Sequence, residues 1–295
     1  MGNTRAQAEA IRIVTAFGNE GKPKDSSPAD WRVGREDIAL QLLERVKGVT
    51  VPHQQNSSLC GPAAFMFCLL TDRPDLYVQF VIDLWKTGKT KLGNLAVEPS
   101  YALRTNMAKA VDPKEGNLEE VDWISLGGLR GYDGVFSEPT NGTAGATHAM
   151  TMHTWFKAVG SIAIYDNTTV IGRANWNDLL KVSCHVASAW VVMLVNGSIL
   201  QRMGTRGGSL FADHWIVATS AIMINNRTAP SLLPAVNNRT CINPRSDTPP
   251  DDTWIINFTA YSWGENNQKL TDAPTTSIAY FFDNYHGASV FSSIP

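Results

Sequence analysis

The sequence lacks several features that mark large classes of protein. It has no run of lysine or arginine of the kind that phosphate binding requires, and its 25 basic and 27 acidic residues give a net charge of −2. Apolar runs such as Ala187–Val195 have nine residues, whereas a membrane-spanning helix needs about 20. We therefore expect a protein that binds no nucleic acid and has no membrane span.

Cysteine is also scarce, with four residues in 295, and these are scattered along the chain as Cys60, Cys68, Cys184 and Cys241. This number does not make a disulfide framework, and no CxxC pair suggests zinc. We expect free thiols, synthesis in a reducing compartment, and neither a metal nor another cofactor. The N-terminal residues carry no apolar core followed by a small-residue cleavage site, so we expect synthesis in a bacterial cytoplasm without a signal peptide.

What is present indicates a globular protein, because apolar residues make up 43% of the chain and charged residues only 18%. The first half has apolar residues at helical spacing. The expected helices are Thr4–Ala16, Arg35–Val46, Cys60–Leu70, Asp75–Trp85 and Thr147–Val159.

The second half changes to alternating and β-branched runs. The expected strands lie in Ala187–Asn196, Trp215–Ile224, Trp254–Trp263 and, less clearly, Ile278–Phe291. Helices followed by strands predict an α+β fold with an antiparallel sheet. The Pro/Asn-rich segment Asn225–Asp252 reads as a long surface loop.

One short motif suggests chemistry. Cys60 precedes Gly61 and Pro62 at the start of an apolar helical run, and proline is favoured in the first turn of a helix. A thiol at a helix N-terminus is stabilised as the nucleophilic thiolate. Gln54, six residues upstream, could donate an N–H to a developing oxyanion. The alternative is that Cys60 is a small apolar residue that happens to begin a helix.

The pattern Gln54, then Cys60-Gly61-Pro62-Ala63-Ala64, resembles the nucleophile segment of papain-like cysteine peptidases, including the bacteriocin-processing and related bacterial branches. The resemblance implies a helical half packed on an antiparallel sheet half, with the active site in the cleft between them. It also implies a general-base histidine and an orienting Asn or Asp on later strands. The expected domains are residues 1–50, with N-terminal helices and a connector, and a catalytic domain of residues 51–295, helical to about 160 and sheet-forming from 161.

Three histidines are candidates for the base. His214 lies in FADHWIVATSAI, which can place the imidazole at the head of a central strand, and we favour it. His148 lies in a segment of helical period, and His185 precedes a strand without a following signature. Trp215, beside His214, is expected to be a core residue.

The third catalytic member departs from the family pattern. Papain-like enzymes often carry Asn-Ser-Trp-Gly on the strand after the histidine, and here Tyr261-Ser262-Trp263-Gly264 matches it. Tyrosine cannot present an amide oxygen at the same depth. Either Ser262 orients His214, or another residue does so, or the site works as a Cys-His dyad. The other candidates are Asn257, Asp283 and Asn284, and Trp263 is expected to be a packing residue.

Further segments resemble papain-like effector toxins delivered by type VI secretion. They are MHTWFKAVG, AWVVMLVN, the Asp-His-Trp-Ile-Val run, YSWG and FFDNYHGASVF, so the resemblance covers most of Gln54 to Phe291. It implies secretion into a target cell, a protein or peptide substrate and a cognate immunity protein that blocks the cleft. Acyl transfer by a cysteine-histidine pair is compatible with several activities. We rank peptide hydrolysis first, glutamine deamidation or transglutamination second and peptidoglycan amidase activity third. The alternative outside the enzymes is a catalytically inactive binding module.

Overall fold

The structure is a computed structural model that describes residues 4–21, 25–55, 57–105, 118–131, 147–200, 211–232, 251–269 and 276–295. The chain forms two compact units. The first contains Met1–Ser161 together with Ile294–Pro295, and the second contains Ile162–Ser293. Residues 1–50, which the sequence analysis set apart, belong to the first unit with the helices that follow them.

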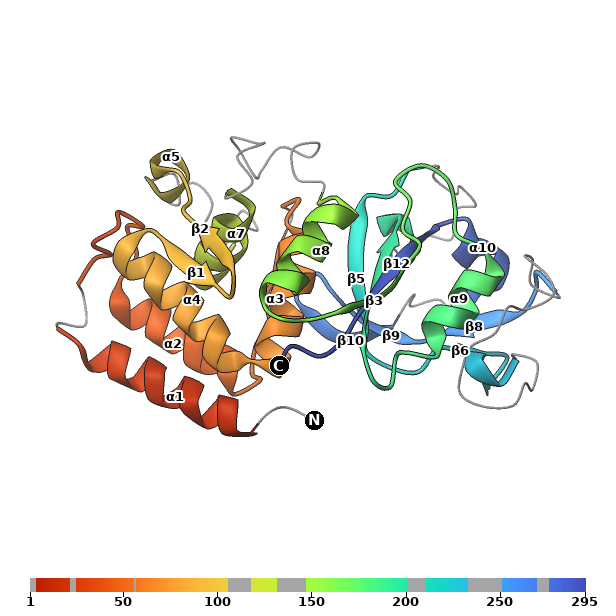
Figure 1. The fold of residues 1–295 in the computed structure, drawn as a ribbon, viewed down its shortest axis with the longest axis horizontal. Coiled ribbons are helices and arrows are strands. Elements are labelled where there is room, and N and C mark those ends of the chain that lie inside the picture. Colours follow the sequence, from red (N-terminus) through yellow and green to blue (C-terminus); the bar gives the residue numbers. More distant parts are fainter. Residues whose placement is uncertain are drawn as a thin grey trace. The chain divides into compact units, whose positions relative to one another are not determined.

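The first unit is mainly helical (Figure 1). Its longer helices are α1 (Thr4–Asn19), α2 (Arg35–Val46), α3 (Cys60–Asp72), α4 (Pro74–Thr87) and α8 (Ala149–Ala158). Its shorter elements are the strand pair β1 (Thr90–Leu92) and β2 (Leu95–Val97), the helices α5 (Tyr101–Thr105), α6 (Glu120–Asp122) and α7 (Gly128–Gly131), and the π-helix η3 (Trp123–Gly127). The five longer helices agree with the expected ones to within a few residues.

Local sequence explains where these helices begin and end. Pro74 occupies the first turn of α4, where its missing N–H removes no helical hydrogen bond. Gly88 ends the helix in a left-handed conformation with φ 72°. In the core, the Phe17 and Trp85 rings meet edge to face with their centroids 5.1 Å apart. The Arg35 guanidinium lies over both rings, so α1, α2 and α4 share one apolar centre.

The second unit contains a six-stranded antiparallel sheet with the strand order β10-β9-β5-β4-β12-β3. The strands are β3 (Ala163–Asp166), β4 (Trp190–Val195), β5 (His214–Ala218), β9 (Thr259–Ser262), β10 (Glu265–Lys269) and β12 (Tyr285–Phe291). A smaller sheet has the order β11-β8-β6-β7. Its strands are β6 (Met223–Ile224), β7 (Arg227–Thr228), β8 (Ile255–Asn257) and β11 (Thr276–Ser277).

One face of the larger sheet packs into a hydrophobic core with α9 (Trp176–Ser183) and α10 (Ile278–Phe282). Asn175 begins α9 with a capping box, in which its side chain and that of Asp178 each accept a backbone N–H. Two 3₁₀ turns, η4 (Gly197–Leu200) and η5 (Ala229–Leu232), complete the described elements of this unit.

The α+β expectation is confirmed, since helices precede an antiparallel sheet. Two local expectations were wrong. Residues 278–282 are helical, so the expected strand Ile278–Phe291 begins only at Tyr285. The expected loop Asn225–Asp252 contains β7 and η5 in its described part, and residues 233–250 lie outside the described residues. Within the described residues, no helix is long and apolar enough to cross a membrane.

Candidate functional site

Cys60 is the first residue of α3 and is only 4% exposed. The residue before it, Leu59, contributes no side-chain acceptor to the first turn of the helix. The positive end of the helix macrodipole therefore lies near the cysteine. A helix N-terminus lowers the pKa of a thiol, whereas burial in apolar surroundings raises it, so an activated Cys60 thiol stays a prediction.

Helix α3 is held rigidly because it is buried on all sides, from Cys60 through Leu70. Phe65 packs against Trp155 and Phe156 of α8, with ring centroids 5.7 and 5.2 Å away. Gly61 is required by the close approach of the segment that leads into α8, because an added Cβ would lie 2.2 Å from Thr147 Oγ1. The Cys-Gly-Pro motif thus places the thiol on a fixed helix end.

Gln54 lies on the segment that precedes α3 and is 4% exposed. Its side-chain Nε2 donates to the Ser57 carbonyl at 3.1 Å, and its own carbonyl accepts the Ser57 N–H at 3.0 Å. A primary amide has two N–H donors. One of them closes this local turn.

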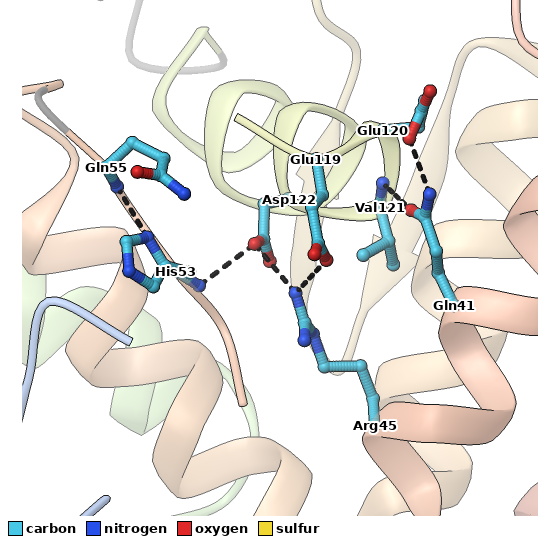
Figure 2. Close-up of polar contacts among 8 residues, drawn as sticks. All are labelled: Gln41, Arg45, His53, Gln55, Glu119, Glu120, Val121 and Asp122. Carbon is cyan, nitrogen blue, oxygen red and sulfur yellow. Dashed lines mark hydrogen bonds and ion pairs between the residues drawn. The ribbon is translucent and has the colours of Figure 1, made fainter. Parts of the chain in front are cut away.

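A buried ion pair supports the same segment (Figure 2). Asp122 Oδ2 accepts from Arg45 Nη2 at 2.8 Å and from the His53 backbone N–H at 2.9 Å. The Arg45 side chain is 1% exposed and that of Asp122 is fully buried. Desolvation raises the pKa of Asp122 to about 7, against the opposing effect of the Arg45 charge.

In the second unit, His214 is the first residue of β5, as the sequence predicted. It is 4% exposed, and burial lowers the pKa of its imidazole to about 4. The ring Nε2 lies 2.7 Å from Ser262 Oγ, which is also buried. Which of the two atoms donates in this hydrogen bond depends on the tautomer of the imidazole.

Strand alternation explains why Ser262, and not Tyr261, meets the imidazole. Val217 of β5 pairs with Tyr261 of β9, so the side chains at 216 and 262 share the opposite face of the sheet. His214 lies two residues before Ile216 and projects to that same face. Tyr261 is 1% exposed on the other face, where it cannot take the role of the family's asparagine.

Trp263 has a more specific position than the packing role expected for it. Its ring stacks on the His214 imidazole, with centroids 4.6 Å apart and planes 30° from parallel. Trp263 has φ 44° and Gly264 has φ 77°, so the turn from β9 to β10 uses two left-handed residues. A non-glycine residue in this conformation is uncommon, and such strain concentrates at functional sites.

The other proposed orienting residues have different partners. Asp283 pairs with Arg173 at 2.6 Å, and the Asn284 side chain bonds to Ser198 and to the Tyr280 carbonyl. Asn257 is exposed on β8. Ser262 is therefore the candidate that contacts the imidazole.

Of the remaining histidines, His148 is the exposed N-cap residue of α8 and belongs to the same unit as Cys60. Its neighbour Thr147 lies against Gly61, the residue that follows Cys60. His148 therefore stays the alternative prediction for the base. His185 lies beyond the end of α9 and is partly buried. Trp215 is buried, as a core role requires.

The cysteines differ in state. Cys60 and Cys68 form no disulfide, whereas Cys184 is disulfide-bonded, so the expectation of a free thiol is wrong at Cys184. Cys241 lies outside the described residues. Burial, and secondarily the Asp72 charge, raises the pKa of Cys68 well above its ordinary value, so Cys68 is not an activated thiol.

The structure thus brings His214 and Ser262 together and places Gln54 and Cys60 on one short segment. Cys60 belongs to the first unit and His214 to the second, so their pairing stays a prediction. In the part of the chain that the structure describes, no three His, Cys, Asp or Glu side chains form a metal-binding group. The chain matches no protein-family model, and comparisons with curated proteins and solved structures give no significant match.

Proposed function

We propose that the protein is a papain-like thiol hydrolase that cleaves a peptide or amide bond. Cys60 is the nucleophile, His214 the general base, Ser262 the residue that orients the imidazole and Gln54 the oxyanion donor. The observation that carries the proposal is the 2.7 Å contact between His214 Nε2 and Ser262 Oγ. It supports Ser262 as the orienting partner, a role that the presence of Tyr261 in place of asparagine had left open.

The proposed reaction is acyl transfer. His214 Nδ1 takes the Cys60 proton as the sulfur attacks the substrate carbonyl, and the carbonyl oxygen becomes an oxyanion stabilised by the Gln54 amide. The imidazolium returns the proton to the leaving nitrogen as the C–N bond breaks. Water then hydrolyses the thioester, with His214 again acting as base.

The low pKa of His214 supports one form of the proposed mechanism. An imidazole whose pKa is about 4 is neutral at physiological pH. It therefore accepts the thiol proton during attack, instead of forming a stable thiolate–imidazolium pair beforehand. The imidazole needs a fixed orientation for this transfer, which Ser262 and the stacked Trp263 provide.

The biological setting that fits the resembling segments is a bacterial effector toxin delivered by type VI secretion. Its substrate would be a protein or peptide of the target cell, and a cognate immunity protein would protect the producing cell. Glutamine deamidation or transglutamination uses the same nucleophile and base on another carbonyl, and peptidoglycan amidase chemistry does so on a cell-wall peptide.

A catalytically inactive binding module is the second candidate function. The observation that favours it is Tyr261, which is buried where the family carries its orienting asparagine. In that case Cys60 is a buried structural thiol that begins α3, and the His214–Ser262 contact only stabilises the sheet.

A growth experiment separates these functions. Bacteria that express the chain in the cytoplasm or, with an added signal peptide, in the periplasm should stop growing, while the Cys60→Ala variant should be harmless. Cys68→Ala is the matched control, because it removes a buried thiol of the same helix, and it should remain toxic. Equal growth defects for wild type and Cys60→Ala would contradict catalysis. Mass spectrometry of the poisoned cells then distinguishes peptide cleavage from deamidation.

A further inference from the structure

The ion pair between Arg45 and Asp122 connects two helices to the segment before the proposed nucleophile. Arg45 lies in the last turn of α2, and Asp122 ends α6 directly before the π-helix η3. Asp122 Oδ2 holds both Arg45 and the backbone N–H of His53, as Figure 2 shows. Glu119, whose side chain is 45% exposed, completes the network with a 2.8 Å bond to Arg45.

Fold stability alone does not explain this arrangement. Burying two charges carries a desolvation penalty, and well-packed apolar residues of similar size often stabilise a fold as well as a buried ion pair does. The pair also leaves one oxygen unsatisfied, because Asp122 Oδ1 is buried and has no hydrogen-bond partner among the described residues. The adjoining π-helix is a rare geometry that is frequent at functional sites.

The contact that distinguishes Asp122 from an ordinary ion-pair partner is the one to His53. His53 Nδ1 in turn accepts the Gln55 N–H at 2.9 Å, and Gln55 has φ 49°, so the backbone turns sharply here. Gln54 lies between these two anchored residues. Its side chain is directed by the backbone on either side of it, and Asp122 holds that backbone from the neighbouring helix.

We infer that Asp122 is a positioning residue of the thiol site, which fixes the His53 backbone and thereby aims the Gln54 amide as the oxyanion donor. The inference rests on the proposed function. It gives a role to the buried Asp122 carboxylate, which takes no direct part in any step of the proposed reaction.

The test uses p-nitrophenyl acetate as an acylation probe. The Cys60 sulfur forms a thioester bond with the acetyl carbon, the ester C–O bond breaks and p-nitrophenolate leaves, passing through an oxyanion. Iodoacetamide is the matched second probe, because its displacement of iodide by the same sulfur forms no oxyanion. A variant that misplaces Gln54 should therefore slow acylation and spare alkylation.

Three variants separate positioning from charge and from folding. Arg45→Met with Asp122→Leu replaces the pair by apolar side chains and removes the acceptor for His53. Asp122→Asn removes the charge but keeps an oxygen that can accept the His53 N–H, so its loss of rate should be smaller. Glu119→Gln changes the exposed partner of Arg45 and should leave both rates at the wild-type level.

We expect the double variant to acylate Cys60 at least about tenfold more slowly than wild type, since removal of an oxyanion donor typically slows a reaction ~10²–10³-fold. Its alkylation rate should be unchanged. Acylation at the wild-type rate would overturn the inference, and so would a parallel loss of acylation and alkylation, which indicates general damage to the fold.

A separate outcome exposes failure of the proposed function itself. If wild-type acylation is no faster than that of Gln54→Ala, Gln54 is not an oxyanion donor. In that case, the rate of backbone hydrogen exchange in residues 51–59 tests whether Asp122 fixes the His53 backbone. Faster exchange in the double variant than in Asp122→Asn supports it, and equal exchange in the two variants overturns it.

Discussion

The His214 imidazole is held between a hydroxyl and an indole, with Nε2 2.7 Å from Ser262 Oγ and the ring stacked on Trp263. Both contacts come from the end of β9 and the turn that follows it. The hydrogen bond to Ser262 restricts rotation of the ring, and stacking on Trp263 restricts the tilt of its plane. Two consecutive residues therefore fix the orientation of the imidazole. In the proposed function, this serine takes the orienting role that an asparagine side chain has in papain-like peptidases.

Loss of the Ser262 hydroxyl should impair the base without unfolding the sheet. Ser262→Ala removes the hydrogen bond to Nε2, and we expect a fall in kcat of roughly tenfold or more with little change in KM, because orientation matters mainly in proton transfer. Steady-state kinetics on the first identified substrate measures this. Ser231→Ala, which removes an exposed serine hydroxyl of the same unit, is the control and should retain full activity. A normal kcat in Ser262→Ala would show that His214 needs no orienting hydroxyl.

Stability should depend on pH through His214. The unfolded chain protonates this residue near its ordinary pKa of 6.5, whereas the native imidazole, with a pKa of about 4, stays neutral. The free energy of unfolding should therefore fall as the pH drops from about 6.5 to 4, by at most about 3.4 kcal/mol from this group. Urea unfolding at several pH values measures the dependence.

The comparison with His214→Gln isolates this contribution, because Asp122 acts in the opposite direction. Its raised pKa, about 7, means that the native state takes up a proton before the unfolded state does, so its contribution to stability increases as the pH falls from 7 towards 4. In His214→Gln, the free energy of unfolding should no longer include the decrease that protonation of His214 causes at low pH. His148→Gln, at an exposed histidine, should keep it. Identical pH profiles for wild type and His214→Gln would contradict a neutral buried imidazole.

The contact between Gly61 and Thr147 predicts a packing defect. In Gly61→Ala, the new Cβ would lie 2.2 to 2.7 Å from three side-chain atoms of Thr147, and such overpacking destabilises by about 1–3 kcal/mol. Urea unfolding should show this loss, and Thr147→Gly in the same chain should recover part of it. Gly18→Ala in α1 meets only Ala39 Cβ at 3.4 Å and should be neutral or slightly stabilising. An unchanged stability in Gly61→Ala would mean that the segment before α8 moves freely.

Local pattern was enough to predict the five longer helices of the first unit and the strand that begins at His214. Helical spacing in Arg35–Val46 and the Cys-Gly-Pro start of α3 are signals carried by neighbouring residues. Ile278–Phe282 was misread as a strand, because five apolar and aromatic residues fit both periods. The sequence signal for the helix was Ser277, whose side chain caps it by accepting the Tyr280 N–H.

Contacts between distant residues could not be read from the sequence. Arg45 and Asp122 are 77 positions apart, and nothing local in either helix marks them as partners. The one available hint was an aspartate in the apolar stretch VDWISLGGL, where a buried charge needs a partner. Similarly, strand alternation selects Ser262 over Tyr261 only when the pairing register of β5 and β9 is known.

The central claim is that Cys60 and His214 act as one nucleophilic pair, and alkylation kinetics test it without a known substrate. The rate of Cys60 carboxamidomethylation by iodoacetamide at neutral pH should fall at least about tenfold in His214→Ala, because the thiol loses the base that activates it. His148→Ala should react as fast as wild type. An unchanged rate in His214→Ala would contradict the pair, and a fall confined to His148→Ala would assign the base to His148 instead.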